Sequence, residues 1–255
     1  MSEQRDKNLW IFNAGNSFAG NPKWMFEYII RHHKEIKPVW MCYNADTMNY
    51  VHKLGYEAEL YHSSKGKSVM AKAGVYVVEM CKEVFQPELS GITVLNLWHG
   101  VGCKSIERKV TDGFLQERIA KKYIQNNDIL RNNQLFLVTS EIMEKHFKEQ
   151  CGIDDDKVIR AGYPRCVVND NIQSYDHDIR KKKGLSANTK LAIYCPTYRD
   201  NNGANFMKSA LPDMKRLAEV LHENNILLIL KMHPLVEKDT QYLAMKEVYR
   251  EHPNF

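Results

Sequence analysis

The sequence lacks the features that identify membrane-spanning, secreted or disordered proteins. None of its apolar runs approaches the ~18–20 residues that a helix needs to cross a bilayer. Its polar start, MSEQRDKN, is followed by no signal-peptide core. The sequence also lacks the low apolar content of a disordered chain. Of the 255 residues, 26% are charged and 44% are hydrophobic, and this hydrophobic content is enough to build a core. We therefore expect a cytoplasmic globular protein.

Several patterns that mark common active sites are missing as well. The six cysteines include no C-x-x-C pair, so they predict neither a zinc ribbon nor a disulfide framework, and we expect free thiols that mostly fill the core. The sequence contains no G-x-G-x-x-G, Walker A, H-E-x-x-H or G-x-S-x-G motif. It therefore gives no support for the usual dinucleotide, P-loop, zinc-protease or hydrolase sites, and we expect no metal ion or other cofactor.

Charge of one sign is in only mild excess. Lys and Arg number 36 and Asp and Glu number 31, so the formal net charge is +5. A small positive excess suits anionic substrates, nucleotides or an anionic membrane surface. It is too weak to indicate nucleic-acid binding, and no nucleic-acid motif accompanies it.

Short β-like apolar runs alternate with longer amphipathic stretches along the chain. Strands are expected at residues 9–13, 39–43, 75–78, 93–97, 135–138, 158–160, 191–194 and 226–230. Helices are expected at residues 24–33, 113–129, 141–150, 213–223 and 240–251, with Ser140 as an N-cap. Several strands are nearly continuous in Val, Ile and Leu, as parallel strands covered on both faces are. This alternation predicts a doubly wound α/β fold.

A change of composition suggests where the chain divides. Residues 169–188 contain few large apolar side chains and resemble a domain boundary. We expect an N-terminal Rossmann-like domain over 1–170, a linker over 171–188 and a partial C-terminal domain over 189–255. The last segment offers only two strands and two helices, fewer than a complete α/β domain needs.

Polar clusters follow four of the predicted strands directly, within residues 95–104, 158–165, 191–200 and 227–234. Ligands of open parallel sheets bind beyond the carboxyl ends of the strands, so these clusters would line one cleft. One candidate is an imidazole suited to act as a base, that of His99. The others are side chains suited to bind phosphates: Lys104, Arg165, Thr197, Arg199, Lys231 and His233. Taken singly, each is more typical of a turn or a solvated side chain than of a site.

Five motifs in order resemble the CDP-glycerol:glycerophosphate glycerophosphotransferase family, whose enzymes build teichoic-acid-like polymers. They are N-x-x-x-x-x-E-Y at residues 21–28, W-H-G at 98–100 with Lys104 after it, G-x-P-R at 162–165, P-T-Y-R at 196–199 and K-x-H-P at 231–234. The order and the approximate spacing match over essentially the whole chain. Each motif is weak alone, but five in order are fairly specific.

The resemblance implies a GT-B-like architecture of two Rossmann-like domains, with the acceptor at the first and the CDP part of the donor at the second. It implies transfer of glycerol phosphate from CDP-glycerol to an acceptor hydroxyl, with release of CMP. His99 is then the candidate base, while His233, Lys231 and Arg199, together with Thr197, would contact the donor. Lys104 and Arg165 would be further anion contacts.

The chain also departs from the family pattern. Residues 101–103 are Val-Gly-Cys where many members have Thr-Pro-Leu, and residues 166–167 are Cys-Val where Asn-Asp is common. The sequence ends before an Asp-Tyr-Ser-Ser-like segment that contributes to the donor site in the family. We therefore expect the second domain to be truncated, with an exposed edge on strand 226–230. Weak or no binding of CDP-glycerol, and no turnover, are expected of these 255 residues alone.

Two other functions remain open at this point. A glycosyltransferase that uses a nucleotide sugar would need the same cleft and the same basic strand ends. A truncated, non-catalytic family member would bind an anionic polymer or a protein partner. For the main reading, the partners are a CDP-polyol donor, a lipid-linked or polymeric acceptor and the anionic inner face of the bacterial cell membrane, to which we expect peripheral attachment.

Overall fold

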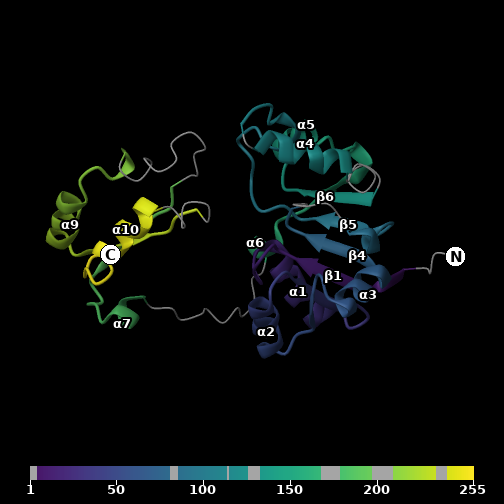
Figure 1. Cartoon of the computed structure of the whole chain (residues 1–255), viewed down its shortest axis with the longest axis horizontal. Coiled ribbons are helices and arrows are strands. Elements are labelled where there is room, and N and C mark those ends of the chain that lie inside the picture. The colour runs from purple at the N-terminus through teal and green to yellow at the C-terminus, as the bar shows by residue number, and fades with distance from the viewer. Residues whose placement is uncertain are drawn as a thin grey trace. The chain divides into compact units, whose positions relative to one another are not determined.

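The computed structural model describes residues 5–80, 86–113, 115–125, 133–167, 179–196, 209–233 and 240–255. The chain forms two compact units, Met1–Ile172 and Gln173–Phe255 (Figure 1). The predicted linker lies at this division, although its residues 171–178 are outside the described part of the chain. Each unit is considered by itself below.

The N-terminal unit is built on a parallel sheet of seven strands. In chain order they are β1 (Asp6–Asn13), β2 (Lys37–Cys42), β3 (Ala58–Leu60), β4 (Ala73–Val78), β5 (Thr93–Asn96), β6 (Gln134–Val138) and β7 (Val158–Arg160). Their order in the sheet is β3-β2-β1-β4-β5-β6-β7, and every pair is parallel. The predicted doubly wound α/β architecture is therefore confirmed for this unit.

Helices connect these strands (Figure 1). They are α1 (Gly20–His32), α2 (Ala45–Lys53), α3 (Ser64–Lys72), α4 (Leu115–Gln125), α5 (Glu141–Cys151) and α6 (Pro164–Val167), with short 3-10 turns η1 (Pro87–Leu89), η2 (Glu107–Lys109) and η4 (Asp155–Lys157). Local signals set the bounds of α5. The Ser140 hydroxyl accepts a hydrogen bond from the Met143 amide, as an N-cap does, and Gly152 ends the helix at φ +68°.

Successive residues of the central strands contribute to two different cores. Phe12, Trp40 and Val77 belong to a cluster that α1 and α5 cover, whereas their neighbours Ile11 and Met41 belong to a second cluster that includes Met70 of α3. Side chains alternate between the two faces of a strand, so both faces of this sheet are buried. That explains why the predicted strands are nearly continuous in apolar residues.

The strand order reverses between β1 and β4. The chain begins in the middle of the sheet, runs outward through β2 and β3, and returns to the other side of β1 at β4. In open α/β sheets this reversal leaves a crevice at the carboxyl ends of the two strands, where ligands bind. The segments that follow β1, β4 and β5 are therefore the first places to look for a site.

The C-terminal unit contains α7 (Ile179–Lys183), β8 (Lys190–Tyr194), α9 (Met214–Glu223), β9 (Ile226–Leu230) and α10 (Thr240–Val248). β8 and β9 form a two-stranded parallel sheet. The second edge of β9 is not fully exposed, contrary to the sequence-based expectation. Asn254 covers part of it, because its carbonyl accepts from the Leu228 amide at 2.8 Å and its side-chain amide donates to the Ile226 carbonyl at 2.8 Å.

All eight predicted strands and the five predicted helices are present, with shifted ends. The sequence analysis missed β3, α2, α3, α6 and α7, which are short elements of nine residues or fewer. The expectation that cysteines mostly fill the core is wrong for the described residues. Cys42 and Cys151 are buried, but Cys103, Cys166 and Cys195 are exposed. Each of these three follows a strand end, where the polar clusters lie.

Candidate functional site

The start of α1 is bound to the segment that follows β4. Gly20 has φ +67°, and a Cβ there would collide with the carboxylate of Glu79, which follows β4. The same carboxylate accepts a hydrogen bond from the Asn21 amide at 3.2 Å. A carboxylate at a helix N-terminus satisfies an amide that has no partner inside the helix. Sequence reasoning missed Glu79, although an acidic residue directly after the apolar strand was the signal for it.

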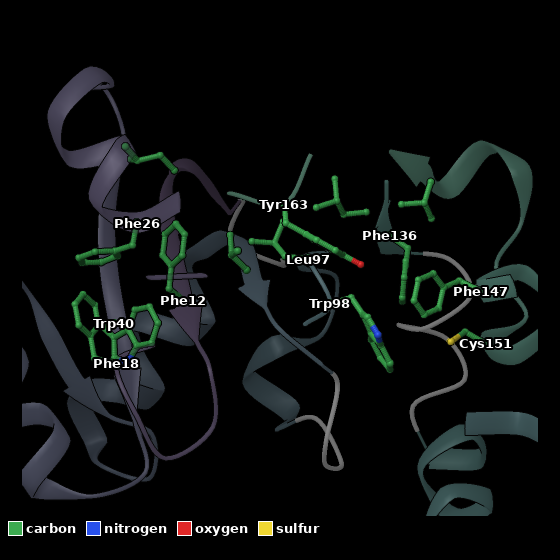
Figure 2. Close-up of a cluster of buried hydrophobic side chains, with 14 of the residues drawn as sticks. Phe12, Phe18, Phe26, Trp40, Leu97, Trp98, Phe136, Phe147, Cys151 and Tyr163 are labelled. Atoms are coloured by element: carbon green, nitrogen blue, oxygen red, sulfur yellow. The ribbon is translucent and has the colours of Figure 1, made fainter. Parts of the chain in front are cut away.

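His99 lies at the same edge of the sheet, three residues beyond Asn96, the last residue of β5. Its side chain is exposed, and its ring stacks on Trp98 with a centroid distance of 4.5 Å and an interplanar angle of 27°. Trp98 is buried and packs on Phe136 and Phe147 (Figure 2). The buried indole thus gives the exposed imidazole a fixed platform.

The turn between the indole and the imidazole has an unusual backbone. Trp98 has φ +52°, in the left-handed region that side-chain-bearing residues rarely adopt. Its amide donates to the Asn96 Oδ1 at 3.1 Å, and the Asn96 side-chain amide donates to the Gln134 Oε1 at 3.0 Å. These bonds hold the end of β5, where the buried Trp98 indole carries the exposed His99 ring stacked on it.

Side chains from outside the loop hold the carbonyls of residues 98–100. The Asn21 side-chain amide donates to the Trp98 carbonyl at 2.7 Å. The Arg165 guanidinium donates to the His99 carbonyl at 2.7 Å, and the Tyr163 hydroxyl donates to the Gly100 carbonyl at 2.7 Å. Burial raises the pKa of the Tyr163 phenol. Two predicted site residues, His99 and Arg165, are therefore brought together.

The remaining candidates of the N-terminal unit lie on the same loop. Lys104 is exposed, and it stands five residues beyond His99 in the segment that leads to η2. The Gly102 amide faces the Met143 Sδ at 3.3 Å, so the loop also rests on α5. Lys104 thus belongs to a loop that is anchored on both sides of it, because the Ile106 amide donates to the Gln150 Oε1 at 2.8 Å.

Two candidates of the C-terminal unit follow β9. Lys231 and His233 are both exposed, while Met232 between them is buried and packs near Tyr242. The Lys231 amide donates to the Tyr194 carbonyl at 3.0 Å, which extends the pairing of the two strands. Thr197 and Arg199 lie outside the described residues, so their predicted place beside His233 stays a prediction.

Two surface hollows lie elsewhere, and no predicted site residue lines either. One, of about 570 Å³, is lined by charged residues of α5 and β7: Glu141, Glu144, Lys145, Lys148, Glu149 and Arg160. The other, of about 350 Å³, is a mostly apolar hollow of the C-terminal unit.

Within the described ranges there is no group of three or more His, Cys, Asp or Glu side chains that could hold a metal ion. Over those same ranges, no helix is long and apolar enough to cross a membrane.

Comparison with known proteins shows which family the sequence of this chain matches. The profile of the family described as CDP-Glycerol:Poly(glycerophosphate) glycerophosphotransferase matches residues 1–251. The teichoic acid poly(glycerol phosphate) polymerase of Bacillus subtilis strain 168 is 25% identical over 242 residues, which are 88% of this chain and 31% of that protein. Its counterpart in Bacillus spizizenii strain W23 is 22% identical over 95% of this chain and 64% of that protein. The chain therefore spans between about a third and two thirds of the length of these relatives.

A solved structure shows the same fold. A variant of the wall teichoic acid polymerase TagF, soaked with CDPG, superimposes with a TM-score of 0.71 and 19% identity over 97% of this chain and 61% of that one. At this identity the likeness establishes the fold alone. The α/β, GT-B-like fold class expected from the sequence is thereby confirmed.

Proposed function

The chain belongs to the CDP-Glycerol:Poly(glycerophosphate) glycerophosphotransferase family, and we propose that it moves glycerol phosphate, or a similar polyol phosphate, from a CDP-alcohol to a hydroxyl of a teichoic-acid-like or capsular polymer. The observation that carries this proposal is His99, an exposed imidazole fixed on a buried indole at the carboxyl edge of the parallel sheet. An imidazole titrates near neutral pH and can accept a proton there.

In the proposed reaction, His99 takes the proton of the acceptor hydroxyl as its oxygen attacks the β-phosphorus of CDP-glycerol. A new oxygen–phosphorus bond forms, and the bond from the β-phosphorus to the bridging oxygen breaks. CMP leaves with the bridging oxygen and its electron pair. Such a phosphoryl transfer depends mainly on positioning and on cations that neutralise the phosphate oxygens.

The cations come from this chain's own side chains. Lys231 and His233, both exposed directly after β9, would contact the pyrophosphate of the donor. Thr197 and Arg199 of the P-T-Y-R motif would join them, and Lys104 would contribute from the acceptor side. No metal ion is needed in this proposal, because cationic side chains and helix N-termini can neutralise phosphates.

Peripheral attachment to the inner face of the cell membrane is the second part of the proposal. The net charge of +5 favours an anionic surface, at roughly 1 kcal/mol for each well-placed basic residue. A lipid-linked acceptor would lie at that surface. Sedimentation with anionic vesicles at low salt would support this attachment, and equal recovery with neutral vesicles would contradict it.

The central test is the variant His99→Ala in the product of the complete reading frame that encodes this chain. We expect turnover of radiolabelled CDP-glycerol, followed as CMP release, to fall by ~10²-fold or more, the usual scale for loss of a general base. Thermal stability should change little because the imidazole is exposed. An active and stable His99→Ala protein would refute the assignment.

A panel of donors separates the proposal from its alternatives. The proposed enzyme incorporates label from CDP-glycerol or CDP-ribitol and not from nucleotide sugars. Incorporation from a nucleotide sugar alone would indicate a glycosyltransferase. Polymer binding without any turnover would indicate a non-catalytic member of the family. The same assay on the 255 residues alone decides whether their donor site is sufficient.

A further inference from the structure

Three consecutive carbonyls beside the exposed imidazole accept hydrogen bonds from three distant side chains. Asn21 of α1 binds the carbonyl of Trp98, Arg165 of α6 binds that of His99, and Tyr163 binds that of Gly100, each at 2.7 Å. These bonds join residues 77, 66 and 63 positions apart in the chain. One segment of backbone is therefore fixed from two other elements of the unit.

That segment needs external support. Trp98 at φ +52° is in a conformation that is unfavourable for a residue with a side chain. Such conformations persist only where the surroundings over-determine them, and they concentrate at functional sites. The three hydrogen bonds, together with the Trp98 amide bond to Asn96 at 3.1 Å, provide that support. Without it, the backbone would relax and the imidazole would leave its place on the indole.

The donors are also linked to one another. The Asn21 Oδ1 accepts a hydrogen bond from the Arg165 backbone amide at 3.4 Å, and the Asn21 backbone amide donates to the Glu79 carboxylate at 3.2 Å. Asn21 is fully buried. Its side-chain amide satisfies groups on two separate segments, the Trp98 carbonyl and the Arg165 amide, and is costly to replace because each lost partner leaves a polar group unpaired.

We propose that Asn21, Tyr163 and Arg165 form a carbonyl clamp that fixes residues 98–100 and thereby aims the His99 imidazole at the acceptor hydroxyl. This inference rests on the proposed role of His99. It assigns Arg165 to the positioning of the base, because its guanidinium is bound to the His99 carbonyl, and so replaces the sequence-based expectation that Arg165 is a phosphate contact. Asn21 and Tyr163 are positioning residues of the same kind.

The test follows the His99 ring directly, by NMR of protein with ¹³C-labelled histidine. Stacking on Trp98 shifts the His99 ring signals upfield. In the clamp variants Tyr163→Phe and Asn21→Asp we expect this shift to be lost. The matched control is Asn13→Asp, because the buried Asn13 side chain donates to the Met41 carbonyl at 2.8 Å and has no hydrogen bond to the loop. The control should keep the shifted His99 signals.

If Asn21→Asp does not fold, Tyr163→Phe still tests the clamp, because this substitution removes only one hydroxyl. Unmoved His99 signals in every clamp variant that folds would overturn the clamp, and so would an equal change in Asn13→Asp. A readout on activity then separates positioning from binding. Tyr163→Phe and Arg165→Lys should lower kcat by about 10- to 100-fold, the scale of a ~1 Å misplacement, with the KM for CDP-glycerol unchanged.

A raised KM with unchanged kcat in Arg165→Lys would restore Arg165 as a phosphate contact and contradict its place in the clamp. If the wild-type protein turns over no CDP-alcohol, the proposed function fails. The NMR comparison still decides the clamp in that case, because it requires only folded protein.

Discussion

Gly100 and Gly102, in the loop that follows His99, differ in the space around them. A Cβ on Gly102 would collide with the ring of His146 on α5, whereas a Cβ on Gly100 would meet only the Arg165 guanidinium, at an ordinary contact distance of 3.6 Å. We expect Gly102→Ala to destabilise the protein by about 1–3 kcal/mol, the usual cost of overpacking. Chemical denaturation measures this change.

The matched control is Gly100→Ala, which should leave the unfolding midpoint nearly unchanged. The double variant Gly102→Ala/His146→Ala removes the obstructing ring and should recover part of the loss. Equal stabilities of the two single glycine variants would show that the loop does not rest on His146 as closely as described.

Glu144 of α5 connects this helix to β7 and makes stability depend on pH. Its carboxylate accepts two hydrogen bonds from the Arg160 guanidinium, at 2.6 and 2.7 Å, and one from Lys148 at 2.5 Å. The Arg160 bonds, followed by that of Lys148, lower the pKa of Glu144 below its usual 4.5. A lowered pKa in the folded state stabilises the protein above the unfolded value, and this contribution is lost as pH falls through the folded value.

We therefore expect Glu144→Gln to reduce the melting temperature at pH 7, with a difference from wild type that shrinks as pH falls below about 4.5. Melting curves across pH 3–7 measure this. Glu141→Gln on the same helix is the control, because Glu141 is exposed and makes no comparable pair with Arg160. A constant difference at all pH values would show that packing, not charge, is the cause.

At the scale of elements, the segment after β5 is fastened to α4 by a buried ion pair. Lys122 and Glu107 meet at 2.6 Å, and both side chains are about nine-tenths buried. Removing one partner of a buried pair leaves an uncompensated charge, which costs about 3–5 kcal/mol. We expect a loss of this size for Lys122→Met, measured by denaturant unfolding.

The double variant Glu107→Gln/Lys122→Met should recover much of that loss, because no buried charge is left without a partner. Lys121→Met is a suitable control, since Lys121 is the exposed neighbour on the same helix. If Lys122→Met and Lys121→Met had equal effects, the pair would contribute nothing to holding α4.

At the scale of the whole molecule, the two units differ in how much they bury. The N-terminal unit has two large apolar clusters, one on each face of its sheet. The described core of the C-terminal unit centres on Met232 and Tyr242, while Ile193 of β8 is 64% exposed. A unit that buries less apolar area per residue has a smaller free energy of unfolding.

Hydrogen exchange should reveal this difference. We expect the amides of β1 and β4 to be strongly protected and those of β8 and β9 to exchange faster by orders of magnitude. The Leu228 amide, bonded to Asn254, should be the slowest of its strand. Equally strong protection in both sheets would show that the C-terminal unit is as stable as the N-terminal one.

The strand–helix alternation could be predicted from the sequence alone, because burial on both faces demands continuous apolar runs and covering helices demand amphipathic ones. The sequence also indicated the polar clusters at the strand ends, including His99, Lys231 and His233. It could not indicate β3, α2 and α3, since elements of nine residues or fewer carry little periodicity.

The contacts that those side chains make depend on how the strands are arranged in space. Arg165 and His99 are 66 positions apart, and nothing in the local pattern says that the guanidinium binds a backbone carbonyl there. The same holds for Asn21 and Glu79, which meet because β1 and β4 are neighbours in the sheet. Local sequence sets which groups stand at a strand end, but the order of the strands sets which of them come within hydrogen-bond distance.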